Sequence, residues 1–456
     1  MRIITLAEKS KEIHECIGYQ NYYTEKSYRK SPYVYKKEID NGIILYNTMT
    51  REISLITGIA EGESYFCEKL VRGWYFIPHD INPKTIVYCF WQKYLSIHPK
   101  RKGKLSLATI FTTTECNARC PYCYEYGTKK ETMSEETAEA AAKYILERAG
   151  NKILLKWFGG EPLLNHKAID IISKRVRDSG IEYRSYIVSN AYLFDKISDE
   201  KIKNLWKISQ AQITVDGTEK EYQKIKGLPS GAYRKALDSI VRLAMLDINV
   251  SVRIHITNSN VEDIKNLIVE LSEYFSGTQE KGKNINVYAA PLFEGLGMEK
   301  NQMSDTERLN LYDSYINIDK MISRFGMGGG AYREKIKSSH CMADNCHSIV
   351  IAPNGDLTPC EHCHDKEIIG TVWSDGEIPE KWFERAAEID ECEECICYPI
   401  CYKLKMCEAE PACNEAERSY KRYQIEKLID SEYKKYMGRR SMGAKGNRNS
   451  EKRNRL

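Results

Sequence analysis

One segment of the chain reads Leu105-Ser-Leu-Ala-Thr-Ile-Phe-Thr-Thr113-Thr-Glu-Cys116-Asn-Ala-Arg-Cys120-Pro-Tyr-Cys123. Its first nine residues have the apolar, β-branched character of a buried strand, and three cysteines follow at once. Three thiolates on one loop can hold three irons of a cubane [4Fe–4S] cluster and leave the fourth iron open. The alternative is a zinc ion bound by these cysteines and a distant fourth ligand.

The residues that follow this segment alternate between apolar runs of strand length and amphipathic helical stretches. Further strands are expected at Ile153–Phe158, Tyr183–Ser189, Gln212–Val215, Val250–Thr257 and Ile285–Leu292, with helices opening at Ser134 and covering Tyr233–Leu246 and Val261–Phe275. Six β-α repeats predict an α/β fold with a parallel sheet, either doubly wound or curled as a partial barrel. Ligands of such folds bind beyond the C-terminal ends of the strands.

A second motif, Trp157-Phe158-Gly159-Gly160-Glu161-Pro162, ends the second of these strands, at the same sheet edge as the cysteines. Two glycines let a ligand approach the backbone closely, and a carboxylate can pair with an ammonium group. With CxxxCxxC after strand one and GGEP after strand two, residues 105–293 resemble the radical S-adenosylmethionine (SAM) enzymes. The resemblance implies a partial (β/α)6 barrel whose cluster binds SAM.

The site residues of that family carry over onto this chain position by position. Cys116, Cys120 and Cys123 would hold the cluster, while Gly159, Gly160, Glu161 and Pro162 would border the methionyl amine, and Tyr122, Ser189, Asn190, Asp216 and Arg253 would complete the SAM site. Arg253 would bind the SAM carboxylate, with a surface salt bridge as its alternative role. Ala191 stands where relatives have glycine, so the turn after Ser189-Asn190 is a departure from the pattern.

The chain has 16 cysteines, and ten of them lie between Cys341 and Cys413. Clustered thiols in a long chain without a secretory signal indicate metal ligands rather than disulfides. A Gly355-x4-Cys360 element and a Cys392-x2-Cys395-x5-Cys401 element resemble the SPASM extension, which carries two auxiliary [4Fe–4S] clusters. That resemblance implies two ligand sets: Cys341, Cys346, Cys360 and Cys407, and then Cys392, Cys395, Cys401 and Cys413. A pair of zinc sites is the alternative.

Three further residues of this segment have predicted roles. Cys363 and Cys397 are surplus to the SPASM pattern, so each is either a ligand or a thiol that meets the substrate. Glu361 directly follows Cys360, where related sulfatase-maturing enzymes place an acidic base. Glu361 is therefore the candidate catalytic base, with a hydrogen-bonding role near the cluster as the alternative.

The residues before the barrel predict a small α+β module with strands at Val34–Ile39, Gly42–Tyr46 and Arg51–Ile56. This module resembles the winged-helix domains that bind precursor leaders in ribosomal-peptide maturases, where a strand edge pairs with the leader. A packing or dimer domain is the alternative. The predicted divisions are this module (1–100), the radical SAM core (101–300), a helical connector (301–337), the SPASM domain (338–415), and a last helix with a disordered basic tail (416–456).

This architecture is typical of maturases of the ranthipeptide and sactipeptide type, which join a cysteine sulfur to a carbon in Cys-rich peptides. The expected partners are such a precursor peptide and a flavodoxin- or ferredoxin-type electron donor. Carbon–carbon crosslinking, epimerisation, decarboxylation and formylglycine formation are alternatives within the family. A non-catalytic zinc protein that binds nucleic acid through its basic tail is an alternative of another class.

Composition limits the remaining possibilities. The 456 residues are 42% hydrophobic and 29% charged, with no apolar run of the ~20 residues that a membrane span needs. The first residues show no secretory signal, so we expect a cytoplasmic protein. The net charge is +4, but residues 438–456 carry a balance of +6, which leaves −2 for the rest. The body of the chain is therefore not expected to bind nucleic acid.

Overall fold

The computed structural model describes residues 1–8, 11–59, 64–97, 103–123, 125, 127–279, 284–292, 303–328, 341–363, 366–374, 376–384, 388, 390–401, 405–407 and 413–453. The side chains of residues 11, 12, 14, 95, 277–279, 363 and 440–453 are outside this description.

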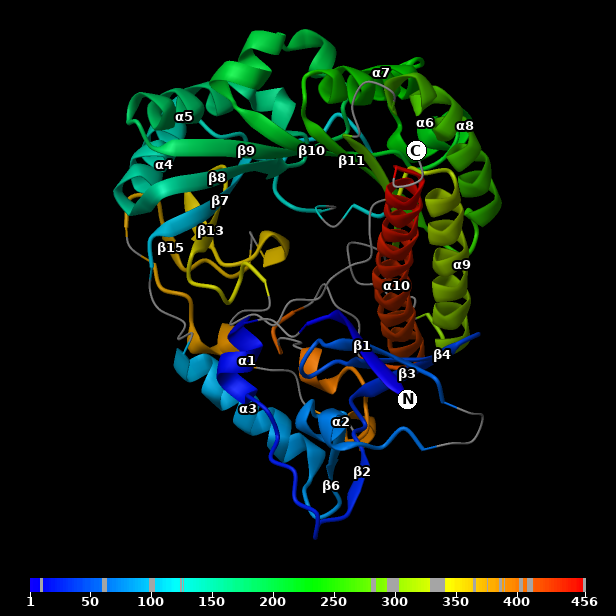
Figure 1. Ribbon diagram of the computed structural model, residues 1–456. Helices are drawn as coiled ribbons and strands as arrows, with labels where there is room; N and C mark the ends of the chain where they lie inside the picture. The colour runs from blue at the N-terminus through cyan, green and yellow to red at the C-terminus, as the bar shows by residue number, and fades with distance from the viewer. Residues whose placement is uncertain are drawn as a thin grey trace.

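The centre of the molecule is a curved sheet of nine strands (Figure 1). Six of them are parallel and follow the chain in order from one side of the sheet to the other: β7 (Leu105–Thr113), β8 (Ala149–Gly159), β9 (Glu182–Ser189), β10 (Ile208–Thr214), β11 (Asn249–Ile256) and β12 (Ile285–Pro291). Their alternating side chains divide between a buried outer face and a half-buried inner face. The predicted α/β fold with a parallel sheet is thus confirmed.

Helices cover the outer face of this sheet (Figure 1). They are α4 (Glu135–Arg148), α5 (His166–Asp178), α6 (Glu219–Lys226), α7 (Ala232–Met245) and α8 (Val261–Gln279), with short turns η1 (Pro162–Asn165), η2 (Phe194–Lys196) and η3 (Lys201–Leu205) between them. Ser134 caps α4, as its position before an apolar-periodic run predicts, by accepting a hydrogen bond from the Thr137 amide. Each helix buries its apolar stripe against the strands, and this layer forms the main core.

The Cys-rich segment adds strands to the same sheet. β13 (Ser348–Ile351) pairs in parallel with β7 and continues through an Asn354-Gly355 turn into β14 (Asp356–Thr358) and then β15 (Gly370–Thr371). Gly355 has a φ of +89°, which glycine adopts without strain. An Asn-Gly pair is typical of a hairpin turn, but the pairing of this hairpin with β7 was not predicted. The barrel core and the Cys-rich segment therefore share one sheet.

The N-terminal module has an antiparallel four-stranded sheet in the order β1 (Arg2–Ala7), β5 (Ile53–Thr57), β4 (Gly42–Asn47) and β3 (Val34–Ile39). A small sheet of β2 (Tyr28–Lys30) and β6 (Phe76–Pro78) and the helices α1 (Lys11–Ile17), α2 (Glu68–Arg72) and α3 (Pro83–Ile97) complete it. The three predicted strands are confirmed within two residues, while β1 was not predicted.

Two long helices, α9 (Asp305–Arg324) and α10 (Glu415–Arg453), run side by side (Figure 1). They link the large sheet, which α9 contacts, to the N-terminal sheet, which α10 contacts. Ser304 and Glu307 form a capping box at the start of α9. Ile425, Leu428 and Ile429 of α10 pack on the N-terminal sheet. The last helix was predicted to give way to a disordered basic tail, and this is wrong, because α10 runs to Arg453. The segment after Tyr436 lacks proline and is rich in good helix formers, which outweighs its glycines.

The remaining short helical turns all belong to the Cys-rich segment: η4 (Glu361–Cys363), η5 (Glu380–Phe383), η6 (Asp390–Cys392) and η7 (Tyr398–Ile400). None of the described helices is both long and apolar enough to cross a membrane.

Candidate active site at the C-terminal edge of the parallel sheet

The cysteine loop leaves the end of β7 and lies against the end of β8. The amides of Gly160 and Glu161 donate to the carbonyls of Thr113 (3.0 Å) and Glu115 (2.9 Å). A Cβ on Gly159 would lie 2.2 Å from the Thr113 oxygen, and one on Gly160 would lie 2.2 Å from the Glu115 oxygen. Both glycines therefore allow the close approach of the backbone that leads into Cys116, and their predicted contact with a ligand stays a prediction.

Glu161 is fully buried and links three segments. Its carboxylate accepts from the Ser189 hydroxyl (2.8 Å), the Asn190 amide (2.8 Å) and the Leu163 amide (3.2 Å). Burial raises the pKa of Glu161 to about 7, although these three donors oppose the rise. Pro162 starts η1 beside it and is also buried. Glu161 therefore fixes the ends of β8 and β9 relative to each other.

The turn after β9 reaches the cysteine loop. Asn190 donates from Nδ2 to Asn117 Oδ1 (2.7 Å) and lies 3.9 Å from Cys116 Sγ. Ala191, where relatives have glycine, keeps a left-handed φ of 67° and is fully buried. This conformation costs an L-residue roughly 1–2 kcal/mol. The turn geometry is thus retained with a different residue.

A second buried network anchors the other side of the loop. Asp216 follows β10 and contacts Lys226 Nζ (2.8 Å), His255 Nδ1 (2.9 Å) and the Tyr122 hydroxyl. Lys226 Nζ also donates to the Tyr122 hydroxyl (3.1 Å), and the Lys226 carbonyl accepts from the Arg119 amide. Tyr122 and Arg119 belong to the cysteine loop, so this network ties the loop to β10 and β11.

The charges of this network stabilise one another. Burial by itself raises the pKa of Asp216, but Lys226 and His255 outweigh burial and hold it well below its usual range. Burial would lower the pKa of Lys226, yet Asp216 and Tyr122 raise it well above its usual value. Asp216 and Lys226 are therefore an ion pair at neutral pH.

The inner face of the sheet has a row of polar side chains, one from each strand from β8 to β12. Tyr186 (β9) and Tyr288 (β12) both donate to Gln212 Oε1 (β10), at 3.1 and 2.8 Å. Arg253 (β11) lies near both tyrosines, and its buried Nε has no hydrogen-bond partner among the described residues. Lys156 (β8) completes the row.

Glu361 comes to this row from the Cys-rich segment. Lys156 Nζ lies 2.5 Å from Glu361 Oε2, and the two side chains are only 15% and 19% exposed. Lys156 Nζ also lies over the rings of Phe158 and Tyr186. The candidate base thus lies on the inner face of the barrel, beside a predicted ligand, Cys360.

The first auxiliary group comprises Cys341, Cys346, Cys360 and Cys407. Burial, with smaller contributions from nearby Asp344, Cys360 and Cys407, raises the pKa of Cys341 to about 12. These three cysteines are therefore neighbours. Cys346 adopts a left-handed φ of 59°.

The second auxiliary group comprises Cys392, Cys395, Cys401 and Cys413. The Cys395 amide donates to the Cys392 carbonyl, and Cys401 lies beside Lys421 of α10. Cys397 is buried in the core between α10 and the N-terminal sheet, and its hydrogen bond is the main cause that lowers the pKa of Cys395 to about 6. Cys397 therefore lies beside Cys395 of this group. The Cys363 side chain lies outside the described residues.

Two buried side-chain donors, one beside the first and one beside the last of the predicted cluster cysteines, fit iron–sulfur clusters. Asn117 Nδ2 is buried beside Cys116, and Arg418 Nη1 is buried near Cys413, and neither has a hydrogen-bond partner among the described residues. Cluster sulfur would be an acceptor at both places. Within the described ranges, no three His, Cys, Asp or Glu side chains surround a single ion position. In a cubane cluster each thiolate binds its own iron.

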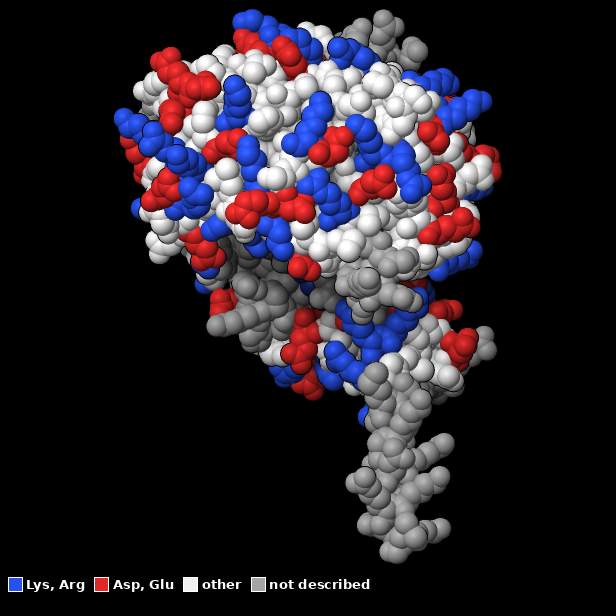
Figure 2. All heavy atoms as spheres, turned by 90° about the horizontal axis from the view of Figure 1, so that it is seen from above, with Lys and Arg blue, Asp and Glu red and all other residues white. Residues whose placement is uncertain are grey.

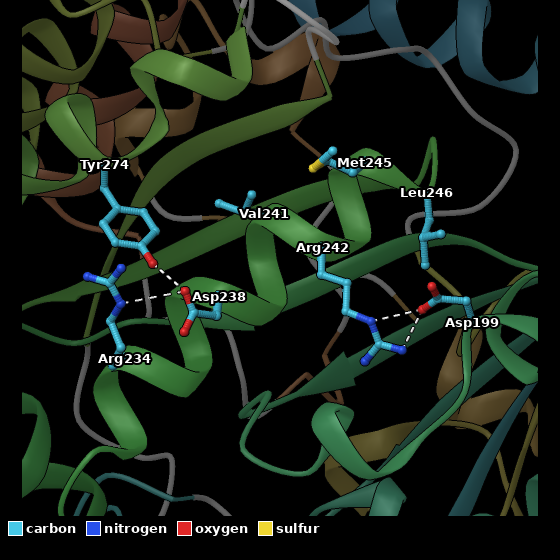
Figure 3. A pocket seen from close by; sticks show the side chains of 8 residues that line it. All are labelled: Asp199, Arg234, Asp238, Val241, Arg242, Met245, Leu246 and Tyr274. Carbon is cyan, nitrogen blue, oxygen red and sulfur yellow. Dashed lines mark hydrogen bonds and ion pairs between the residues drawn. The ribbon is translucent and has the colours of Figure 1, made fainter.

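A surface hollow of about 840 Å³ lies away from this site, on the outward side of α7 (Figure 3). It is lined by Asp199, Arg234, Asp238, Val241, Arg242, Met245, Leu246 and Tyr274. Its charged side chains pair with one another, as Arg242 does with Asp199. Figure 2 shows acidic and basic residues interspersed over this helical face, without a basic patch of the kind that binds nucleic acid.

Residues 110–271 match the family model of the Radical SAM superfamily. An uncharacterized protein, MJ0907 of Methanocaldococcus jannaschii, is 35% identical over 24% of this chain and 37% of its own length, so that match covers about a third of the relative. A GTP 3',8-cyclase of Clostridium perfringens is 26% identical over 56% of this chain and 79% of its own length. The sporulation killing factor maturation protein SkfB of Bacillus subtilis is 23% identical over 43% and 47%.

Among solved structures, anSMEcpe with bound AdoMet and Cp18Cys peptide is similar in fold, with a TM-score of 0.52 and 16% identity over 72% of this chain and 99% of that one. The fold and the match to the family model define the class of domain that residues 110–271 carry, which is a radical SAM domain. Domains of this superfamily use a [4Fe–4S] cluster and SAM. The Cys-rich C-terminal segment of the chain is consistent with a SPASM extension.

Three residues of the site were missed from the sequence. Lys156 had a signal, because it is a lone cation in the apolar run Ile153–Phe158. His255 had one as well, since it lies two positions after Arg253 and so faces the same side of β11. Lys226 ends an ordinary charged helix, and nothing in the pattern distinguishes it.

Proposed function

We propose that this enzyme is a peptide maturase that forms thioether crosslinks between a cysteine sulfur and a carbon of a Cys-rich precursor. The supporting observation is the Lys156–Glu361 contact, because it brings the Cys-rich segment to the inner face of the SAM barrel. A carboxylate and a cysteine-bound cluster would then border the same cavity as the SAM site. The maturation role of SkfB and the peptide bound by anSMEcpe are consistent with a peptide substrate.

The ligand sets follow from the sequence resemblance. Cys116, Cys120 and Cys123 would hold the cluster that binds SAM, and the first and second auxiliary groups would hold one cluster each. The cluster held by Cys116, Cys120 and Cys123 would, together with SAM, supply a 5′-deoxyadenosyl radical that takes hydrogen from an unactivated carbon. Glu161 and Arg253 would bind the methionyl amine and carboxylate, and Tyr122, Asn190 and Asp216 would border the rest of SAM.

The chain's own residues have three tasks in this reaction. The networks of Glu161 and Asp216 hold the cysteine loop. The tyrosine–glutamine row and Lys156 position the peptide on the inner face. Glu361 accepts the proton of the substrate thiol, and Lys156 holds that carboxylate in place. Each thioether removes one hydrogen atom, one proton and one electron from the peptide, which is a loss of about 2 Da.

The test uses the reconstituted full chain, SAM, a reductant and a short Cys-rich peptide chosen from the reading frames that neighbour its gene. We expect a loss of about 2 Da per crosslink and a cysteine that resists alkylation. A peptide that keeps its mass and all its reactive thiols would contradict the proposal. The control is a variant in which Cys116, Cys120 and Cys123 are alanine, which should be inactive.

A second candidate is oxidation of Cys or Ser to formylglycine. It is favoured by the position of Glu361 directly after Cys360, where related sulfatase-maturing enzymes place an acidic base. The same assay separates the two, because formylglycine is an aldehyde that reacts with hydrazides and a thioether does not.

Two partners complete the proposal. The precursor's leader would pair with an edge strand of the N-terminal sheet, whose edges are β1 and β3. A flavodoxin- or ferredoxin-type protein would supply the electron. Fluorescence anisotropy of a labelled leader peptide tests the first, with a scrambled leader as the control that should not bind.

A further inference from the structure

Helix α10 places a lysine against the second auxiliary group. It begins at Glu415, two residues after Cys413, and runs past Cys401. Lys421 Nζ lies 3.5 Å from Cys401 Sγ, within reach of an N–H···S hydrogen bond, and its side chain is only 17% exposed. The neighbouring carboxylate oxygen, Glu417 Oε1, is farther from Lys421 Nζ, at 3.7 Å. The lysine charge is therefore largely shielded from water beside the thiol.

One helical turn earlier, Arg418 faces the same group. Its Nε and Nη2 donate to Glu415 Oε2 at 3.2 and 3.0 Å, which fixes the plane of the guanidinium. Its Nη1 is buried and has no partner among the described residues. Cys395 and Cys413 lie close enough to interact electrostatically with its guanidinium group. An acceptor at the cysteines would satisfy this donor.

Opposite charges are present but are placed differently. Glu391, Glu393 and Glu394 flank Cys392 and Cys395 in sequence, and all three are exposed. Exposed charges are screened by solvent, whereas the two cations of α10 are mostly buried. Glu417 is a mostly buried carboxylate beside Lys421, and it also accepts a hydrogen bond from the Tyr312 hydroxyl. The first auxiliary group has the reverse arrangement, with the buried Asp344 carboxylate 3.0 Å from the Cys341 amide.

We propose that Lys421 and Arg418 are positioning residues of the second auxiliary group, where they donate hydrogen bonds to cluster and cysteine sulfur and raise the reduction potential of its cluster. Each added electron makes a cluster more negative, so buried cations stabilise the reduced form. The inference depends on the cluster set of the proposed function, but it requires no assignment of peptide or crosslink.

The test is a potentiometric titration of the reconstituted full chain, followed by electron paramagnetic resonance. The background carries alanine at Cys116, Cys120 and Cys123, so that only the auxiliary clusters contribute. In Lys421→Gln we expect about a tenfold lower ratio of reduced to oxidised cluster at a given potential, for one of the two signals only. That ratio corresponds to a shift of about 59 mV to lower potential for a one-electron couple. Arg418→Gln should shift the same signal.

Two controls make the outcome decisive. Lys427→Gln removes another partly buried lysine of α10, which pairs with Asp319 at 2.6 Å, and should leave both signals unchanged. Lys421→Arg keeps the charge and should restore most of the potential. Selective loss of about four irons in Lys421→Gln also supports the proposal. Full iron content with unchanged potentials in both Lys421→Gln and Arg418→Gln would overturn it, whether or not the enzyme modifies a peptide.

Discussion

Replacing Lys226 by methionine should destabilise the protein far more than removing an ordinary surface lysine. The Lys226 and Asp216 side chains are 4% and 1% exposed, and they are 2.8 Å apart. Lys226→Met leaves the Asp216 carboxylate buried with only His255 and the Tyr122 hydroxyl as polar neighbours. Breaking a buried pair in this way costs about 3–5 kcal/mol.

The assay is guanidinium denaturation of the cluster-free chain, followed by tryptophan fluorescence. The matched control is Lys235→Met, whose pair with Asp195 has a similar separation of 2.7 Å but is 43% and 44% exposed, and should cost under about 1 kcal/mol. The double variant Lys226→Met with Asp216→Asn should be less destabilised than the sum of its single variants, because no uncompensated charge remains. The reasoning is refuted if Lys226→Met costs no more than Lys235→Met, or if the two single effects simply add.

Other perturbations test single features of the same site. Gly160→Ala should abolish iron binding at the cysteine loop, measured as loss of about four irons, since its Cβ would meet the Glu115 carbonyl; normal iron content would show that the loop can move away. From about pH 4.5 to 7 the cluster-free chain should lose stability as pH rises, because native Glu161, with its pKa near 7, retains a proton that the unfolded chain releases. This dependence of stability on pH should vanish in Glu161→Gln. An unchanged dependence in that variant would contradict the assignment to Glu161. Ser304→Ala removes the cap of α9 and should cost about 1 kcal/mol in thermal denaturation, with no change in iron content.

The sequence predicted the elements of the barrel well because their signals are local. Leu105–Thr113 matches β7 residue for residue, and Ser134 caps the helix that its position predicts. The motif residues also gather at one sheet edge, since the ends of parallel strands meet there. The roles of those residues at the SAM and auxiliary sites remain predictions.

What the sequence could not provide depends on contacts between distant segments. The close approach of the Thr113 and Glu115 carbonyls to Gly159 and Gly160 is an example, because no local pattern indicates it. Lys226 has no local signal, because its importance arises only where α6 meets the cysteine loop. The pairing of β13 with β7 is invisible to any periodicity argument for the same reason.

That pairing has a consequence for how the protein is made. The Ser106 hydroxyl reaches the His347 carbonyl across 241 residues of chain, at the point where β13 joins β7. During synthesis, β7 therefore has an unprotected edge until the ribosome has released residues 348–351, near the start of the Cys-rich segment. An open strand edge invites pairing with other chains. We expect truncations that end before residue 348 to aggregate even though they contain the whole barrel, and a chain that is completed before its clusters are inserted to remain better protected from aggregation.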